Sequence, residues 1–394
     1  MKPNCIAVPE ILLPAPSVDM TAWAVIACDQ HTSDAAYWEE LDRLVGDKPS
    51  TLRLTLPEIY LSETEQRLPQ ISAAMRDYRA RGVFRKMGKG FILTERTTPF
   101  SPMRRGVVLA VDLERYSYEK KSDAMIRATE ATILERIPPR LKIRESAALE
   151  FPHIMLLYDD PGDTVLGPYR DIPLETVYDF DLNMNGGHIR GRFLADTAPL
   201  TESFDRLVRD GLLFMVGDGN HSLATAKAAW EKIKAGLSEG ERESHPARYA
   251  LCEAVNLYDD GIRFEAIHRV VKKVDAEKFA GGFRPEGSCE GALCIGGKKF
   301  PCKIGCDAPG AVAAADEYIA RYIAENGGEV DYIHGEGELL RLTEQPGCVG
   351  ILLPKMDKSE LFASVKKYGS LPRKTFSMGE SEEKRYYIEG REIK

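Results

Sequence analysis

The chain has 394 residues, 43% of them hydrophobic and 29% charged, a balance typical of a folded globular protein that excludes extensive disorder. Its formal net charge of -8 leaves no general basic footprint, so we expect no nucleic-acid partner. The length exceeds what a single core usually supports, which predicts more than one subdomain.

The start of the chain and its cysteines indicate the compartment. Prolines at positions 3, 9, 14 and 16 interrupt the first residues, and no segment reaches the roughly 18 apolar residues that cross a bilayer. We therefore expect a cytoplasmic protein without a membrane partner. Eight scattered cysteines are too sparse for a disulfide scaffold. The cluster Cys289, Cys294, Cys302 and Cys306 lacks zinc-ribbon spacing, so packed thiols are favoured over a structural zinc.

The N-terminal third predicts one buried strand and two helices. The strand covers residues 22–29, because a short apolar run ends there at polar turn residues. The first helix covers 32–46, with its apolar residues on one face and Gly46 closing it. The second covers 62–78 and is predicted to begin with a capping box, Ser62-x-x-Glu65.

The middle of the chain alternates strands and helices. The apolar runs predict strands at 91–96, 106–114, 153–160, 212–218 and 248–260, and helices at 123–137, ended by Pro138 and Pro139, and at 222–235. This alternation predicts an α/β fold, with a mixed sheet and flanking helices.

The last third is rich in turns, with helices expected at 308–325 and 357–367. A soft boundary falls near 270–275. We therefore divide the chain into an N-terminal α/β region (1–100), a central core (101–272) and a C-terminal α+β region (273–394).

The most informative stretch is "GDGNHSLATA", where an apolar run turns into a helix. Its polar residues fit a capped turn, but they also fit an anion or metal site, because exposed backbone N–H groups and the helix dipole favour negative ligands. Glycine permits close approach of a ligand to the backbone. The candidate phosphate- or nucleotide-binding residues of this turn are Gly217, Gly219, Asn220 and Ser222, and the candidate catalytic residues are Asp218 and His221.

Other polar residues also lie near predicted strand ends, where α/β proteins tend to bind ligands. Candidates for a substrate pocket are Asp29, His31, Asn185 and His188. Candidates for phosphate contacts include His268 and Arg269 in "FEAIHRV", and the basic groups Arg140-Lys142-Arg144 and Arg373-Lys374. Each taken singly is also explained by a structural histidine or a solvated surface charge. The nucleotide, hydrolase and zincin motifs GxxxxGK[ST], GxGxxG, GxSxG and HExxH are missing.

These stretches together resemble the prokaryotic family called domain of unknown function 1015. The resemblance extends over essentially the whole chain and is carried by "VIACDQHTSDAAYWEEL", "VDLERYSYEK", "IRATEATILERIPPR", "PHIMLLYDD", "VGDGNHSLATA", "HPARYALCEAVNL", "FEAIHRV" and "LPRKTFSMG".

The turn "DGNHSLATA" is also similar to the Asp-Gly-x-His-Arg turn of the ParB/sulfiredoxin superfamily. This similarity implies a ParB/sulfiredoxin-like core whose turn binds a nucleotide or substrate phosphate through Asp218 and His221. In the kinase branch of that superfamily an acidic residue after the first core strand acts on the substrate hydroxyl, and Glu119 is its best match here. Ser222 stands where the superfamily has arginine, so the resemblance requires Arg144, Arg269 or Lys374 to replace it, or a different chemistry.

Three functions follow from these residues. The first is phosphoryl transfer or phosphate-ester hydrolysis on a small polar metabolite, with Mg²⁺ and ATP or ADP as implied cofactors and Asp218 as the candidate metal ligand. The family context favours serine or phosphoserine as that metabolite. The second is a nucleotide- or metabolite-binding regulator without turnover. The third is a metal-dependent hydrolase with Asp29, His31, His188, Asp218 and His221 as ligands. A homo-oligomer is compatible with all three.

Overall fold

The computed structural model describes residues 5–132 and 137–394, which form two compact units. Unit 1 runs up to Ile262 and also includes Glu380–Lys394, and unit 2 is Arg263–Gly379. Residues 380–394, which the sequence analysis grouped with the C-terminal region, thus make most of their contacts with unit 1.

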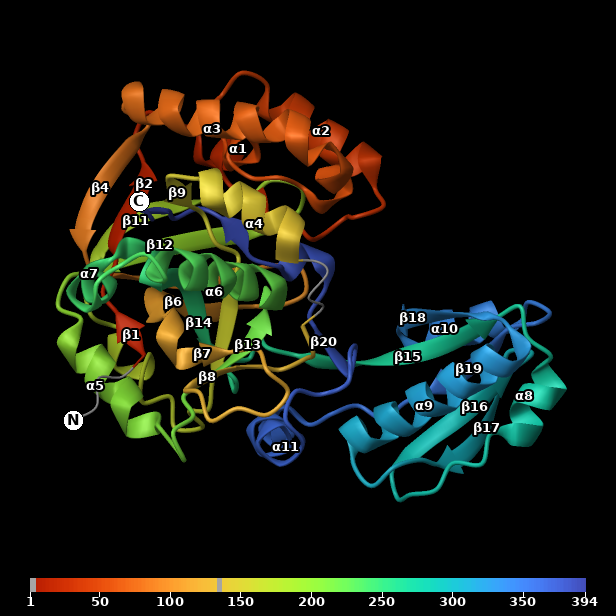
Figure 1. Cartoon of the computed structure of the whole chain (residues 1–394). Coiled ribbons are helices and arrows are strands. Elements are labelled where there is room, and N and C mark those ends of the chain that lie inside the picture. The colour runs from red at the N-terminus through yellow and green to blue at the C-terminus, as the bar shows by residue number, and fades with distance from the viewer. Residues whose placement is uncertain (1–4, 133–136) are drawn as a thin grey trace. The chain divides into compact units, whose positions relative to one another are not determined.

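A ten-stranded mixed sheet organises the described part of unit 1 (Figure 1). Its order is β11 (Glu175–Asp181), β12 (His188–Leu194), β5 (Phe91–Thr97), β6 (Arg104–Asp112), β14 (Tyr249–Asn256), β10 (Met155–Tyr158), β13 (Phe214–Asp218), β8 (Ile126–Ala128) and β7 (Tyr116–Ser117), with β1 (Ile6–Ala7) also paired to β6. The pairs β14–β10, β13–β8 and β8–β7 are parallel, and the other pairs are antiparallel. The predicted mixed α/β fold is confirmed.

Both faces of this sheet are buried, as the period of two along β6 illustrates. Val107 and Leu109 join one core, which α5 (Ala198–Leu207) and α6 (Asn220–Lys234) cover. Val108 joins a second core on the opposite face, together with Trp38 and Leu41 of α2 (Ala35–Val45). Helix α6 therefore packs on one face of the sheet, directly after strand β13 in the chain (Figure 1).

The N-terminal predictions are confirmed for the first helix and wrong for the strand at 22–29. Asp19 accepts hydrogen bonds from two backbone N–H groups and starts a short helix, α1 (Met20–Trp23), leaving only β3 (Val25–Ile26) extended. Helix α2 is capped by the side chain of Asp34, which accepts a hydrogen bond from the N–H of Tyr37, and it ends at the expected Gly46. Helix α3 (Thr64–Ala80) begins without a side-chain cap, so the predicted capping box is wrong, because Ser62 belongs to the 3₁₀ segment η2 (Glu58–Glu63).

The predicted helix at 123–137 is also wrong. Its first part is strand β8, held between β13 and β7, and Thr129 donates a hydrogen bond to the carbonyl of Val216. The prolines do not end a helix but lie in the first turn of α4 (Ile137–Ser146), where the missing N–H of proline has no helical acceptor to lose. The prediction for 133–136 lies outside the described residues.

The segment 380–394 is built into unit 1 by paired strands and buried arginines. Strand β21 (Tyr386–Tyr387) pairs with β3, and β22 (Arg391–Glu392) pairs with β9 (Leu149–Glu150). Buried Arg96 donates hydrogen bonds to the carbonyls of Gly186 and of residues 382–384. Buried Arg385 pairs with Glu253 at 2.7 Å and Glu389 at 2.5 Å. These contacts fix the position of the residues between them, Lys384 included.

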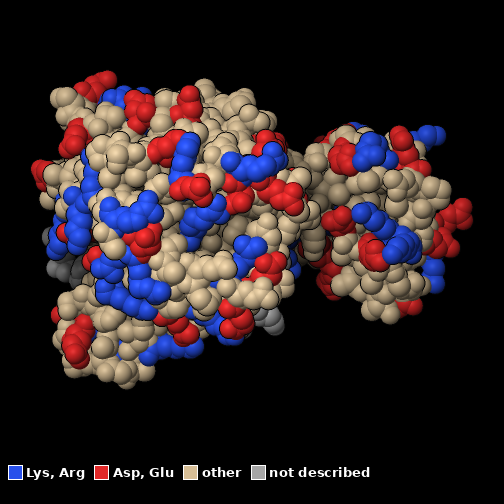
Figure 2. Space-filling view, turned by 90° about the horizontal axis from the view of Figure 1, so that it is seen from above, with Lys and Arg blue, Asp and Glu red and all other residues tan. Residues whose placement is uncertain are grey.

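Smaller elements complete unit 1. Strand β2 (Glu10–Pro14) pairs with β4 (Phe84–Lys89), and α7 (Glu239–Ser244) follows α6. The face shown in Figure 2 carries basic and acidic side chains interspersed with one another.

Unit 2 has an antiparallel sheet and a core of its own. The strand order is β17 (Lys298–Lys303), β16 (Glu290–Ile295), β19 (Val349–Leu352), β15 (Phe264–Lys272) and β18 (Glu329–His334), and β20 (Phe376–Met378) also pairs with β15. Its helices are α8 (Ala276–Gly282), α9 (Ala308–Asn326), α10 (Glu336–Thr343) and α11 (Leu361–Tyr368), so both predicted helices are confirmed. Across the described part of the chain, no helix is long and apolar enough to cross a membrane.

Candidate functional site at the start of helix α6

The turn between β13 and α6 places Gly219, which has no side chain, at the N-cap of a 15-residue helix. Gly219 adopts φ 80° in the left-handed region, and a Cβ there would lie 3.0 Å from the Cα of Ile154. The first helical hydrogen bond runs from the N–H of Leu223 to the carbonyl of Gly219. The N–H groups of residues 220–222 precede this bond, at the positive end of the helix dipole.

Asp218 and Lys384 meet beside this turn. The Oδ2 of Asp218 lies 3.5 Å from the Nζ of Lys384, and its Oδ1 accepts a 2.9 Å hydrogen bond from the N–H of Gly219. Both side chains are largely buried, about one fifth exposed. A cation thus stands next to the helix N-terminus, and the carboxylate that partly neutralises it is held in place by the backbone.

His153 lies next to the same turn because β10 runs antiparallel to β13, which brings the amino end of β10 to the carboxyl end of β13. Its Nδ1 is 2.8 Å from the hydroxyl of Tyr387. Its Nε2 is 3.3 Å from the Oγ of Ser222 and 3.6 Å from the Oδ2 of Asp29. Because Ser222 and Asp29 share one ring nitrogen, this arrangement differs from a serine–histidine–aspartate triad, in which they use opposite nitrogens.

The charges of this group depend on one another. Burial lowers the pKa of His153, but the Asp29 carboxylate, and behind it Asp218, outweigh burial and raise that pKa above its usual range. Burial raises the pKa of Asp29, but His153 and Gln30 outweigh it and hold this pKa well below its usual range. His153 therefore carries a positive charge over a wider pH range than a free histidine does.

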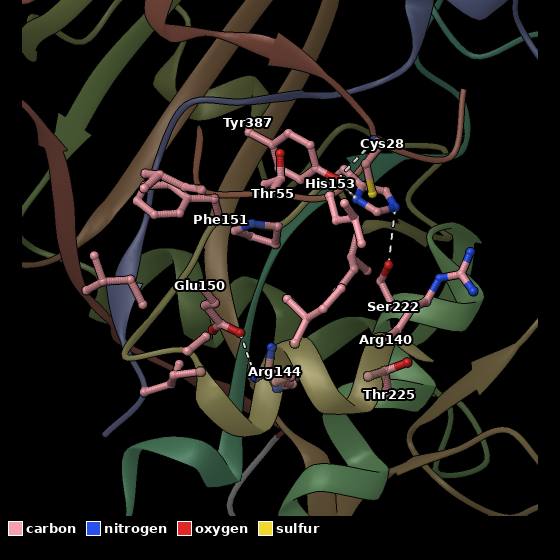
Figure 3. A pocket seen from close by; sticks show the side chains of 18 of the residues that line it. Cys28, Thr55, Arg140, Arg144, Glu150, Phe151, His153, Ser222, Thr225 and Tyr387 are labelled. Carbon is pink, nitrogen blue, oxygen red and sulfur yellow. Dashed lines mark hydrogen bonds and ion pairs between the residues drawn. The ribbon is translucent and has the colours of Figure 1, made fainter. Parts of the chain in front are cut away.

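His153, Tyr387 and Ser222 also line a cavity of about 150 Å³ (Figure 3). Helix α4 contributes Arg140 and Arg144, and helix α6 contributes Ser222 and Thr225. Most of the other lining residues are apolar: Leu54, Leu56, Leu61, Met75, Ile143, Ala147, Leu149, Phe151, Pro152, Ile154 and Ile393. Arg144, predicted from the sequence as a phosphate contact, thus shares this cavity with Ser222.

Glu119 lies on the same edge of the sheet as Asp218. Because β13, β8 and β7 are parallel, their carboxyl ends meet at one edge. Glu119 follows β7 and has an exposed side chain, and Glu130 follows β8, one strand nearer to Asp218. His221 and Asn220 begin α6, and the Oδ1 of Asn220 is a buried acceptor without a hydrogen bond.

The remaining candidates of unit 1 have other surroundings. His31 lies two residues after Asp29 in the chain, and its ring stacks on that of Tyr37 with the centroids 3.7 Å apart. His188 lies 2.6 Å from both Asp179 and Asp181, carboxylates that raise its pKa despite some burial. Asn185 is exposed in the turn before β12. The carbonyl of Gly186 in this turn accepts a hydrogen bond from Arg96, which also donates to the carbonyl of Lys384 and so links the turn to segment 380–394.

His268, Arg269 and Lys374 belong to unit 2. The guanidinium of fully buried Arg269 is bound by Asp316 and by the carbonyls of residues 267, 373 and 374. The Nδ1 of His268 accepts a hydrogen bond from the N–H of Leu353, and burial lowers its pKa to about 4. These contacts give Arg269 and His268 structural roles within their own unit.

Metal-ligating residues do not gather in the described ranges, where no group of three or more His, Cys, Asp or Glu could hold an ion. The five ligands of the predicted hydrolase include His188, which is engaged by Asp179 and Asp181. Cys289, Cys294, Cys302 and Cys306 are free thiols, and burial raises the pKa of Cys294 to about 11.

The sequence does not mark His153, Tyr387 or Lys384 as site residues. His153 begins a predicted strand, and only the antiparallel pairing of β10 with β13 brings the start of that strand to the turn. Lys384 and Tyr387 lie more than 160 positions beyond the turn in a segment without a recognisable motif, and no local signal marks them.

The fold and site define a mixed α/β protein with a cationic, uncapped helix N-terminus at the edge of its main sheet. The family model described as protein of unknown function (DUF1015) matches residues 11–344, and the chain belongs to this family. The matched segment ends before Lys384 and Tyr387.

Comparisons with solved structures give low similarity. A free serine kinase in complex with AMP has a TM-score of 0.41 at 12% identity, covering 71% of this chain and 90% of that one. A conserved hypothetical protein from Pyrococcus furiosus has 0.38 at 12%, covering 71% and 94%. SbnI with a C-terminal truncation, from Staphylococcus aureus, has 0.35 at 11%, covering 69% and 82%. The search of curated proteins finds no match.

Proposed function

We propose that the start of α6 binds the phosphate of a nucleotide or phosphate ester, and that the protein transfers or hydrolyses this phosphoryl group on a small polar metabolite. The observation that carries this proposal is the meeting of Lys384 and Asp218 beside the N-terminus of α6. Fixed N–H groups and a cation placed before the reaction begins stabilise the negative charge that develops in phosphoryl transfer.

His153 supplies a second cation beside the turn. When protonated, its Nδ1 donates to the Tyr387 hydroxyl and its Nε2 points towards Ser222 and Asp29. A phosphate at the start of α6 would then lie near both Lys384 and the imidazolium. This pair replaces the arginine that the ParB/sulfiredoxin-like turn places after its histidine, and the ParB/sulfiredoxin-like character of the core is part of the proposal.

The proposed acceptor side is the sheet edge formed by β7 and β8. Glu119 is proposed as the base for the metabolite hydroxyl, with serine or phosphoserine as the first metabolites to test. Mg²⁺ is usually held by one or two carboxylates together with substrate phosphates, so Asp218 fits as its protein ligand. A bound Mg²⁺ would neutralise phosphate charge there.

A regulator without turnover is the second candidate. The Asp218 carboxylate is already engaged by Lys384 and by the N–H of Gly219, which favours binding over proton transfer at this residue. The two candidates predict the same ligand and differ in the product.

The test measures binding and turnover on the same variants. Calorimetry with ATP, ADP and inorganic phosphate, each with and without Mg²⁺, is run on the parent, Lys384→Met and Asp218→Asn. Lys232→Met is the matched control, because Lys232 is an exposed lysine on the same helix. Loss of one charged contact costs about 1.5–3 kcal/mol, so Lys384→Met should weaken phosphate binding about 10- to 100-fold and Lys232→Met should not.

Turnover is followed by phosphorus NMR, with serine as the phosphoryl acceptor in one experiment and phosphoserine as the phosphoryl donor in another. Product that disappears in Asp218→Asn and Glu119→Gln supports the enzyme, whereas tight binding without product supports the regulator. A parent protein that binds no phosphate compound, or a Lys384→Met protein that binds as the parent does, would refute the site.

A further inference from the structure

The cavity lined by Arg144, His153 and Ser222 has the properties of a binding site for a small organic anion. Its volume of about 150 Å³ is similar to that of engineered cavities that bind benzene, which has six heavy atoms. The lining is mostly apolar, and Glu58 and Arg140, which are partly exposed, line it as well. A ligand of this size would therefore place an apolar body against Leu149, Phe151 and Ile393.

The charges at the α4 side of the cavity do not cancel. Arg144 and Arg391 share one buried carboxylate, Glu150, with Arg144 Nη2 lying 2.6 Å from its Oε2. Arg391 also donates to the carbonyls of Pro246 and Tyr249. Arg140 pairs separately with Glu58 at 2.9 Å. Two guanidinium groups on one carboxylate leave a surplus positive charge, which a second carboxylate would neutralise.

Arg144 also has unused hydrogen-bonding capacity. Its Nη2 is buried and makes no aligned hydrogen bond, although it lies close to Glu150. Buried guanidinium donors are normally satisfied, because an unsatisfied one has lost its water without replacement. The hydroxyls of Ser222 and Thr225 line the same cavity on the α6 side (Figure 3).

We infer that this cavity binds a small monocarboxylate with an apolar body, held through its carboxylate by Arg144. The carboxylate would accept a hydrogen bond from Nη2 of Arg144, and its apolar body would fill the apolar part of the cavity. The inference goes beyond the proposed phosphate site. The cavity shares His153, Tyr387 and Ser222 with that site, but its anchor Arg144 has no part in the proposed phosphate binding.

The test uses the full chain and a series of straight-chain carboxylates from acetate to octanoate, each compared with its uncharged primary amide by calorimetry. Affinity should peak at about six to eight heavy atoms, the size that a cavity of this volume holds. Each amide should bind about 10- to 100-fold more weakly than its carboxylate, the cost of a lost charged hydrogen bond.

Variants then locate the site. Arg144→Met should remove the preference for carboxylate over amide, and Glu150 keeps its partner Arg391 in this variant. Lys142→Met is the matched control, because Lys142 is exposed on the same helix and does not line the cavity. Ala147→Leu narrows the cavity and should move the preferred length to a shorter acid.

The outcomes separate this inference from the proposed function. Carboxylate binding that survives Lys384→Met and fails in Arg144→Met supports the cavity site whatever the phosphate experiments show. Absence of binding by the parent, equal affinity for acids and amides, or unchanged binding in both Arg144→Met and Ala147→Leu would overturn it.

Discussion

His153 shows how one buried residue links two parts of the site. It is 3% exposed, yet it lies within 3.6 Å of an aspartate, a serine and a tyrosine from three different segments. Burial alone would keep the imidazole neutral, and the carboxylates of Asp29 and Asp218 reverse this preference. A histidine in this position couples the charge at the α6 N-terminus to pH.

This coupling predicts a pH-dependent stability. Because the pKa of His153 is raised in the folded state, its contribution is fully present below the unfolded pKa of about 6.5 and is lost as pH rises through the raised value. In that window the free energy of unfolding should fall with a slope approaching about 1.4 kcal/mol per pH unit. His153→Gln should lose this slope in urea denaturation between pH 6 and 9.

His188→Gln is the control for the pH experiment. The pKa of His188 is raised too, but its side chain is 45% exposed, so solvent screens its pairs with Asp179 and Asp181 and its contribution should be small. Identical slopes in the parent and in His153→Gln would contradict the assigned charge of His153.

At the scale of elements, the turn between β13 and α6 depends on backbone conformation as much as on side chains. Gly219 follows β13 in a left-handed conformation, and the chain then enters α6, where the N–H of Leu223 donates to the carbonyl of Gly219. The antiparallel neighbour β10 approaches so closely that Ile154 lies against Gly219. Position 219 thus requires both a positive φ and the absence of a side chain.

Gly219→Ala should therefore destabilise the protein by about 1–3 kcal/mol, the usual cost of a non-glycine residue held in this region. The measurement is urea denaturation at pH 7. Gly240→Ala in α7 is the control, because a Cβ there meets nothing within 4 Å and alanine favours a helix. If both variants have the stability of the parent, position 219 does not require a positive φ and the absence of a side chain in solution.

At the scale of the whole molecule, each unit has its own hydrophobic core and its own buried arginine paired with a carboxylate. In unit 1, Arg385 is bound by buried Glu253 and Glu389, and in unit 2, Arg269 is bound by Asp316, whose side chain is 35% exposed. Arg385 holds the pKa of buried Glu253 down at about 2 against the opposing effect of burial. Removing one partner of a buried pair leaves an uncompensated charge.

We therefore expect two thermal transitions in calorimetry, one for each unit. Breaking a fully buried pair costs about 3–5 kcal/mol, so Arg385→Met should lower the midpoint of one transition by several degrees. Arg269→Met should lower the midpoint of the other transition by less, because its partner Asp316 is partly exposed. Arg81→Met removes an exposed pair and should change neither. A single transition that both buried variants shift equally would contradict independent unfolding of the units.

The sequence by itself determined the mixed α/β fold, the family and the elements with strong local signals. Helices 32–46 and 222–235 were predictable from their local sequence. Gly46 marks the end of the first helix, and Gly219 precedes the second. The strand that ends at Asp218 and the helix after it already located a turn that could bind an anion.

Only the tertiary structure decided the elements with weak local signals and the partners of the turn. Residues 126–128 are a strand because β13 and β7 supply hydrogen bonds that a sequence window cannot represent. His153 reaches the turn through antiparallel pairing, and Lys384 and Tyr387 reach it because buried arginines hold segment 380–394 against the sheet. Contacts between distant residues depend on packing and register, and a local pattern carries no information about either.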